Sequence, residues 1–459
     1  MDRQPDKTVP TLAKNLLYYF LTGLILVIPA VMNNSPLVYS DSGSYMARSF
    51  SLEPMTDRPM GYPLIIRAVT WQSTMWTVVF FQGMLASWLI FEVLRQVMPT
   101  RRSLWRVHVP LLFVLLLTSS LPWYASQLMP DALTGLIGLL LFLVFFGSGL
   151  GKVKLSFMWL CLFFIGLSHF AHLAVLIAVA LCMIVVKLLP AFRASFGRWF
   201  WLNWSLLLAV VLGSMIFTRS YNKAYGHGWV MAPASDLFLA AKLCESGVMY
   251  EHLKRNCPQR EHPLCSGLDK FDRSAMFYIW DEASPLRHPD GDVAASKAIA
   301  PLLNEVLGDP ANWGMILSST LTATLVQLTQ VQIGSGLHAY RENSAPWWPY
   351  QKELHHELPL YMGSHQQLGK WNFSMVNNIN YVALAVSLLS VILLWRTASR
   401  RVQCFVVVAL VVVFFNAMAT AGLANIYDRL QARVTWLLVL AACLMQLEWY
   451  LRKARERVV

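Results

Sequence analysis

Ionisable residues stand in separate polar stretches between apolar runs, and they are the main chemical feature of this sequence. Asp41 and Arg58 lie in the first stretch, Asp131 lies in the second, and the last stretch carries Arg429 and Arg433. A carboxylate can accept a proton as a general base, and a planar guanidinium matches the oxygens of a phosphate. These residue types therefore predict acid–base chemistry beside a bound phosphate.

Each of these residues also has a structural alternative. Asp41 precedes Ser42 and could cap a helix, and Asp131 could stabilise the first turn of one. Arg429 and Arg433 are four residues apart and could extend to lipid headgroups instead of clamping a phosphate. The sequence leaves both sets of roles open.

Two histidines add a further candidate. His169 and His172 are three residues apart, a spacing that suits one face of a helix. Two histidines without a fixed carboxylate are a weak metal signal, and structural hydrogen bonds are the alternative. Asp41, Asp131 and His172 are the residues that could hold a divalent ion, so metal binding stays an open question.

The composition predicts an integral membrane protein. Apolar residues make up 56% of the 459 residues, and charged residues make up only 14%. The net charge of +12 could indicate nucleic-acid binding, but the cations lie in short connectors between apolar runs. We therefore predict an all-α polytopic membrane protein with no nucleic-acid partner.

Ten apolar runs are near the length of a membrane-spanning helix, at about 16–32, 74–97, 108–122, 131–149, 155–169, 172–189, 199–217, 379–395, 402–421 and 433–450. The connectors after the second, fourth, sixth and eighth runs, and the C-terminus, are rich in Lys and Arg. Ten spans with both termini in the cytoplasm place all these cations on the cytoplasmic side. The candidate site residues then lie on the opposite side.

This topology divides the chain into three parts. Residues 1–217 form an N-terminal membrane core of about seven spans, with a first outer loop at 33–73, and residues 374–459 hold the last helices. The segment 218–373 is too long for a structureless loop, so we expect a mostly helical extracytoplasmic domain. Within it, 313–337 is rich in glutamine, serine and threonine, and should lie at the outer surface or re-enter the membrane.

Three of the seven cysteines lie in this outer segment, so they allow one disulfide at most. Cys257 with Cys265 is the pairing we favour, while pairings with Cys244 stay open. A disulfide here requires an oxidising compartment.

The order of the short polar motifs resembles that of the GT-C glycosyltransferases, polytopic enzymes that use polyprenyl-phosphate-linked sugars. Asp41 in Ser40–Tyr45 matches their first-loop acid, and 58–64 (Arg-Pro-Met-Gly-Tyr-Pro-Leu) matches an element that ends in Tyr-Pro-Leu. Asp131 matches an acid at the start of the fourth span, and 429–433 is similar to a late Arg-Tyr motif. The likeness is greatest to bacterial aminoarabinose transferases of lipid A and protein O-mannosyltransferase-like proteins.

The resemblance implies a sugar transfer with inversion, from a polyprenyl-phosphate donor to an envelope glycan, lipid or protein acceptor. It implies Asp41 as general base and Asp131 as a second catalytic residue that positions the acceptor or orients Asp41. It implies donor-phosphate binding by outer residues, namely Arg58, Tyr62, His169, His172, Arg429 and Arg433. The expected location is the bacterial inner membrane, with the site facing the periplasm.

Three competing interpretations share the same features. The chain could be a transporter or flippase for a lipid-linked substrate, or a non-catalytic subunit that assembles envelope glycans. It could also be a polymerase or ligase with a pyrophosphate-linked donor. The sequence departs from the GT-C pattern at Ser42 and Leu430, where a second acid and a tyrosine are usual.

Overall fold

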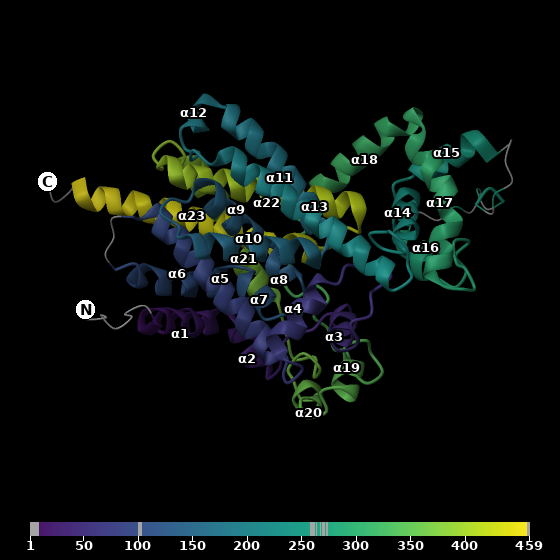
Figure 1. Cartoon of the computed structure of the whole chain (residues 1–459), viewed down its shortest axis with the longest axis horizontal. Helices are drawn as coiled ribbons and strands as arrows, with labels where there is room; N and C mark the ends of the chain where they lie inside the picture. The colour runs from purple at the N-terminus through teal and green to yellow at the C-terminus, as the bar shows by residue number, and fades with distance from the viewer. Residues whose placement is uncertain are drawn as a thin grey trace, which may run out of the picture.

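The computed structural model describes residues 9–99, 103–257, 262, 264–266, 268, 271 and 274–456. In this part of the chain the secondary structure is helical throughout, apart from one parallel bridge between Leu37 and Gln127. Figure 1 shows long helices packed side by side, with both chain ends at the left and the helices α14–α17 at the right. The all-α fold class is confirmed.

Within the described residues, six helices are long and apolar enough to cross a membrane. They are α5 (Trp76–Val97), α11 (Phe170–Leu188), α13 (Phe200–Ala224), α21 (Ser374–Leu394), α22 (Arg400–Leu423) and α23 (Asp428–Glu456). Each overlaps one of the ten predicted runs. The chain is therefore a helical membrane protein.

The other four predicted runs form shorter or interrupted helices, so ten spans remain a prediction. These helices are α1 (Val9–Leu26), α2 (Ile28–Asn33), α6 (Trp105–Thr118), α8 (Asp131–Thr134), α9 (Leu136–Phe146) and α10 (Lys152–Ser168). The break between α1 and α2 lies beside Pro29. Proline has no amide hydrogen for the helical hydrogen bond, so it interrupts a continuous helix.

Connectors that were predicted to share the cytoplasmic side meet at one end of the bundle. Arg401 donates hydrogen bonds to the Gln96 carbonyl at 2.8 Å and to the Ser148 hydroxyl at 3.1 Å. Lys154 forms an ion pair with the buried Glu92. These contacts join the ends of α5, α9, α10 and α22.

The predicted outer segment 218–373 contains two different parts. One part has a hydrophobic core of its own, built from α14 (Ser235–Glu245), α15 (Val248–Asn256), α16 (Ala275–Trp280) and α17 (Asp292–Gly308). In the other part, α19 (Trp347–Lys352) and α20 (Leu358–Met362) contribute Tyr350 and Tyr361 to the core of the membrane helices. Between them, α18 (Pro310–Thr329) packs along α22 and is not among the six spanning candidates.

The predicted disulfide between Cys257 and Cys265 is confirmed. Cys244 is a free, buried thiol in the core of α14–α17. The bond lies in the part of the outer segment that has its own core. A disulfide between cysteines that lie close along the chain constrains this region, which has only a small hydrophobic core.

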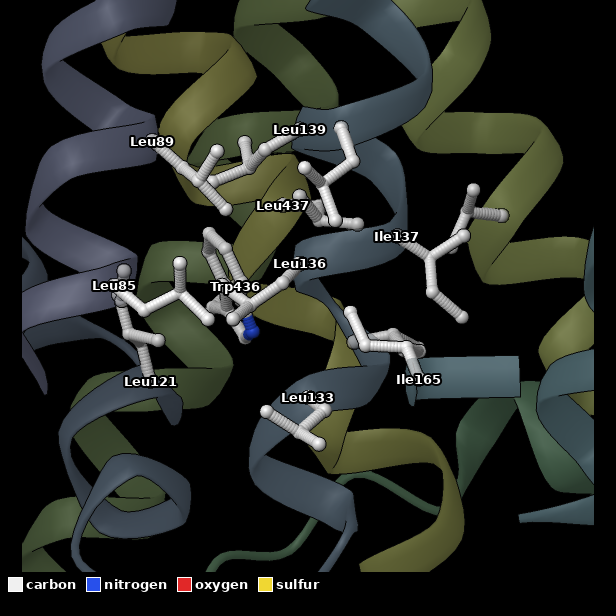
Figure 2. Packing of buried hydrophobic residues seen from close by; sticks show 14 of the residues in the cluster. Leu85, Leu89, Leu121, Leu133, Leu136, Ile137, Leu139, Ile165, Trp436 and Leu437 are labelled. Atoms are coloured by element: carbon white, nitrogen blue, oxygen red, sulfur yellow. The ribbon is translucent and has the colours of Figure 1, made fainter. Parts of the chain in front are cut away.

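A close approach between α8–α9 and α23 positions the second acid. A Cβ atom at Gly135, between α8 and α9, would lie 2.4 Å from the Trp436 ring, so only glycine fits. Trp436 is buried among leucines of α5, α7 (Leu121–Ala125) and α9 (Figure 2). This packing brings Asp131, at the start of α8, against Arg433, one turn before Trp436 on α23.

Candidate functional site

Backbone pairing brings the first two polar stretches together. The Leu37 amide donates to the Ser126 carbonyl at 2.8 Å, and the Leu128 amide donates to the Leu37 carbonyl at 2.9 Å. Asp41 follows the first strand-like segment and Asp131 follows the second. The bridge therefore holds the backbones of both acids at the same end of the bundle.

Two aspartates and three arginines form a continuous chain of ion pairs at this end. Arg58 Nη1 is 3.1 Å from Asp41 Oδ1, and Arg429 Nη1 is 3.4 Å from Asp41 Oδ2. Arg429 Nε is 3.5 Å from Asp131 Oδ2, and Arg433 Nη1 is 2.5 Å from Asp131 Oδ1. The fold thus gathers side chains from three distant parts of the sequence into one charged cluster.

The two ends of the cluster differ in accessibility. The Asp41 side chain is 28% exposed and the Arg58 side chain is 20% exposed. Asp131 and Arg433 are 1% and 0% exposed, and Arg429 lies between these extremes at 12%. A ligand from outside can therefore reach Asp41 and Arg58, whereas Asp131 and Arg433 are enclosed by protein.

Neither aspartate caps a helix through its side chain. Asp41 directly precedes α3 (Ser42–Ser51) and Asp131 begins α8, yet no side-chain capping hydrogen bond is made at the start of either helix. Both carboxylates face arginines instead. The capping alternative therefore does not account for Asp41, whereas Asp131 does lie in the first turn of α8, where its charge also suits the helix N-terminus.

Aromatic residues support the Arg58 side chain. Asp57 Oδ2 accepts hydrogen bonds from Arg58 Nε at 2.9 Å and Nη2 at 2.6 Å, and the guanidinium lies 5.5 Å from the centre of the Tyr45 ring. Tyr45 in turn packs edge-on against Tyr62, at the start of α4 (Gly61–Thr70). Tyr62 is fully buried and donates to Gln82 Oε1 at 2.8 Å. Tyr62 therefore packs behind Tyr45, and its hydroxyl is directed to Gln82.

The two histidines make internal hydrogen bonds. His172 is buried, with Nδ1 at 2.8 Å from the Ile165 carbonyl and Nε2 at 2.8 Å from Thr134 Oγ1. His169 Nδ1 accepts from the Ala171 amide at 3.1 Å and so caps α11. These contacts support the structural alternative for both residues.

Across the described residues, no three His, Cys, Asp or Glu side chains gather in a group that could hold a metal ion. The carboxylates of Asp41 and Asp131 both face guanidinium groups, and both ring nitrogens of His172 have protein partners. The three residues proposed for a divalent ion therefore do not fit one as they stand here.

Three neighbours of the arginines were not among the sequence candidates. Asn416 Oδ1 accepts from Arg433 Nε at 3.2 Å and Nη2 at 2.9 Å. Tyr124 donates to the Arg429 carbonyl at 2.9 Å, and the Tyr39 ring centre is 3.7 Å from the Arg429 guanidinium carbon. Asn416 could have been recognised from the sequence, because an amide side chain inside an apolar run needs a hydrogen-bond partner. No feature of the sequence pointed to Tyr39 or Tyr124.

The surrounding charges set the protonation state of Asp41. Burial raises the pKa of the Asp41 carboxyl, but the guanidinium groups of Arg58 and Arg429 outweigh burial, and the pKa is lowered overall. Asp41 is therefore ionised at neutral pH. It is also a weak base as long as both arginines remain paired with it.

Two apolar pockets lie between helices of the bundle, and each lining includes a residue close in sequence to a candidate site residue. The larger, of about 780 Å³, lies between α11, α18 and α22 and is lined by Ala174 and Ile426. Ala174 is two residues after His172, and Ile426 is three residues before Arg429. The smaller, of about 170 Å³, is lined by α4, α5, α10 and Leu133 of α8. Neither lining includes a residue of the ion-pair cluster itself.

Comparisons with protein-family models, with curated proteins and with solved structures find no match to this chain. A function for it must therefore be inferred from the charged cluster and its surroundings. The relevant features are the accessible carboxylate, its two arginine neighbours and the apolar pockets between the helices.

Proposed function

We propose that this protein is a membrane glycosyltransferase that moves a sugar from a polyprenyl-phosphate donor to an acceptor hydroxyl or amine. The observation that carries the proposal is the accessible Asp41 carboxylate, which lies between the guanidinium groups of Arg58 and Arg429. A base beside two cations that match phosphate oxygens suits this reaction. The resemblance of the Asp41 and Arg58 motifs to those of GT-C glycosyltransferases supports the same assignment.

In the proposed reaction, an Asp41 oxygen takes the proton of the acceptor group while that group forms a bond to the anomeric carbon. The bond between the anomeric carbon and the phosphate oxygen breaks, and its electron pair leaves with the polyprenyl phosphate. The anomeric configuration is inverted in this single displacement. Arg58 and Arg429 stabilise the negative charge on the departing phosphate.

The buried half of the cluster has a supporting role in this proposal. Asp131 faces both Arg429 and Arg433, and Arg433 is held in turn by Asn416. Because Asp131 is enclosed, we assign it to the orientation of Arg429 and not to contact with the acceptor. Tyr62, His169 and His172 are assigned to packing and hydrogen bonding around the site.

Donor binding should make Asp41 a stronger base. A phosphate would accept hydrogen bonds from the same guanidinium groups that now lower the pKa of Asp41. As those groups turn to the phosphate, the pKa of the carboxyl should rise. Proton uptake by Asp41 is then favoured only when the donor is in place.

The larger apolar pocket suits the isoprenoid tail of the donor. It lies between α11, α14, α18 and α22, and its lining is mainly apolar, with hydroxyl groups of α18 and Ser246 and the ion pair of Lys242 with Glu245. Burial of hydrocarbon there is favourable, and the phosphate would then lie near Arg429. This arrangement supports a lipid-linked donor over a soluble nucleotide sugar.

We place the protein in the bacterial inner membrane, with both termini in the cytoplasm and the site facing the periplasm. The grouping of Arg401, Lys154 and their partners at one end of the bundle supports a cytoplasmic side there. The disulfide between Cys257 and Cys265 supports an oxidising compartment for the outer segment.

The direct test uses the full-length protein in lipid nanodiscs with a polyprenyl-phosphate sugar and glycan, lipid or peptide acceptors. Mass spectrometry should detect free polyprenyl phosphate together with a glycosylated acceptor. Movement of intact donor across sealed vesicles, without its cleavage, would instead support a flippase. Cleavage only of pyrophosphate-linked donors would indicate the polymerase or ligase alternative.

Replacing Arg429 with glutamine should weaken the binding of a polyprenyl phosphate by about tenfold or more, because a charged hydrogen-bond donor is lost. Titration of nanodisc samples by native mass spectrometry measures this change. Arg48→Gln is the matched control, since Arg48 is 36% exposed and pairs with Glu53. An unchanged titration in Arg429→Gln would assign Arg429 to structure or lipid anchoring.

Replacing Arg58 with glutamine should raise the pKa of Asp41, because Arg58 is the strongest opposing charge to its burial. The rate falls when Asp41 becomes protonated, so the acidic limb of the pH profile of kcat/KM should move to higher pH. The Arg48→Gln variant should keep the limb of the unmodified protein. If the acidic limb of the kcat/KM profile lies at the same pH in Arg58→Gln as in the unmodified protein, the assignment of Asp41 as the base is contradicted.

A further inference from the structure

The Tyr39 ring is the surface on which the Arg429 guanidinium rests. The guanidinium carbon lies 3.7 Å from the ring centre, and its nitrogens point toward Asp41 and Asp131. A cation over the face of an aromatic ring is attracted by the ring quadrupole. One face of Arg429 is thus covered by the ring, and the nitrogens at its edge are directed to the carboxylate oxygens.

A glycine fixes the position of the Tyr39 ring from another side. Gly336 has φ +79°, a conformation that side chains rarely adopt, and a Cβ atom there would lie 1.7 Å from a carbon of the Tyr39 ring. Any larger residue at this position must displace the ring. Because the Tyr39 ring contacts both Gly336 and Arg429, a shift of the loop around Gly336 should move the ring and with it the Arg429 guanidinium.

The loop 334–340, called here the glycine loop, is tied to the segment that carries Tyr39. Gln366 Nε2 donates to the Val38 carbonyl at 2.7 Å and to the His338 carbonyl at 3.1 Å. The Tyr340 hydroxyl donates to the Gly336 carbonyl at 2.9 Å. These bonds hold the glycine loop and the backbone before Tyr39 in one unit.

The residues just before the glycine loop also hold the start of α23. The Gln332 amide donates to Asp428 Oδ1 at 3.0 Å. Gln327 exchanges hydrogen bonds with the backbone of Tyr427, at 2.8 and 3.1 Å. The same outer segment therefore contacts both the residues that lead into Arg429 and the ring on which Arg429 rests.

We propose that Tyr39 is a positioning residue, held by the glycine loop, that orients Arg429 toward the donor phosphate. The glycine loop would then set donor affinity without touching the donor itself. The identity of the ligand rests on the proposed function, whereas the positioning of Arg429 can be tested without it.

Four variants of the full-length protein test this proposal. Gly336→Ala should displace the Tyr39 ring, and Tyr39→Leu removes it. Gly369→Ala is the matched control, because Gly369 also has a positive φ, of +66°, but has open space where a Cβ would lie. Tyr39→Phe keeps the aromatic ring and should behave as the unmodified protein.

The first measurement is the rate at which phenylglyoxal modifies Arg429, followed by peptide mass spectrometry with the more exposed Arg48 as internal reference. Gly336→Ala and Tyr39→Leu should label Arg429 several-fold faster, while Gly369→Ala and Tyr39→Phe should match the unmodified protein. Unchanged labelling in Tyr39→Leu overturns the proposal, and this comparison remains decisive if Gly336→Ala fails to fold.

The second measurement is binding of a polyprenyl monophosphate in nanodiscs. Gly336→Ala and Tyr39→Leu should raise its Kd by about tenfold, and KM for the donor should rise with little change in kcat. If labelling changes but the unmodified protein binds no polyprenyl phosphate, the proposed function fails and the positioning of Arg429 stands. If the unmodified protein binds a polyprenyl phosphate but the labelling of Arg429 does not change in the variants, the positioning of Arg429 by Tyr39 fails and the proposed function stands.

Discussion

Replacing Asp41 with asparagine should lower kcat by at least about 100-fold, because the amide cannot accept the acceptor's proton. The protein should still insert into membranes and bind a polyprenyl phosphate, since Arg58 and Arg429 remain. Product release measured by mass spectrometry, together with phosphate titration of the same sample, checks both parts. Asparagine has nearly the same shape as aspartate, so packing should be preserved.

Asp57→Asn is the matched control for this change. Asp57 lies in the same loop and also contacts Arg58, but in this structure its ion-pair partner is Arg58 alone. Its replacement should loosen Arg58 and weaken donor binding modestly, while kcat stays within a few-fold of the unmodified value. Near-normal turnover in Asp41→Asn would remove Asp41 from the role of base.

Replacing Asp131 with asparagine should destabilise the folded protein by about 3–5 kcal/mol, because it leaves the fully buried Arg433 without a counter-charge. Thermal unfolding in detergent should show a large drop in midpoint temperature. Asp41→Asn should unfold near the unmodified midpoint, because its carboxylate is 28% exposed. The Asp131→Asn and Asp41→Asn variants should therefore differ in stability as well as in activity.

A double variant sharpens this second test. Replacing Asp131 with leucine and Arg433 with methionine removes both buried charges, so much of the lost stability should return. Recovery of folding without recovery of activity would agree with orientation of Arg429 by Asp131. A stable but inactive Asp131→Asn protein would instead favour a direct catalytic part for Asp131.

The membrane character and the outer disulfide could be predicted from local features of the sequence. Hydropathy over some twenty residues identifies a spanning helix, and six of the predicted runs form such helices in the described chain. The pairing of Cys257 with Cys265 required only that two cysteines lie close along the chain. The need for glycine at position 135 was not predictable, because the side chain that leaves no room for a Cβ there is the distant Trp436.

The different accessibility of Asp41 and Asp131 within the cluster could not be predicted either. Asp41 and Asp131 have similar surroundings in sequence, each at the start of a helix after a polar stretch. Their accessibility depends on α23, which is about 300 residues further along the chain than Asp131. Tyr39 shows the same limitation, since its contacts with Arg429 and Gly336 join three remote segments.

The sequence by itself thus determined that the chain is a helical membrane protein with acids and arginines in the connectors, because apolar runs and charges are local properties. Only the tertiary structure decided that Asp41 is reachable while Asp131 is enclosed. It also decided that Arg429 rests on Tyr39. Burial and orientation are set by helices that meet from distant parts of the chain, and no local pattern records which of them meet.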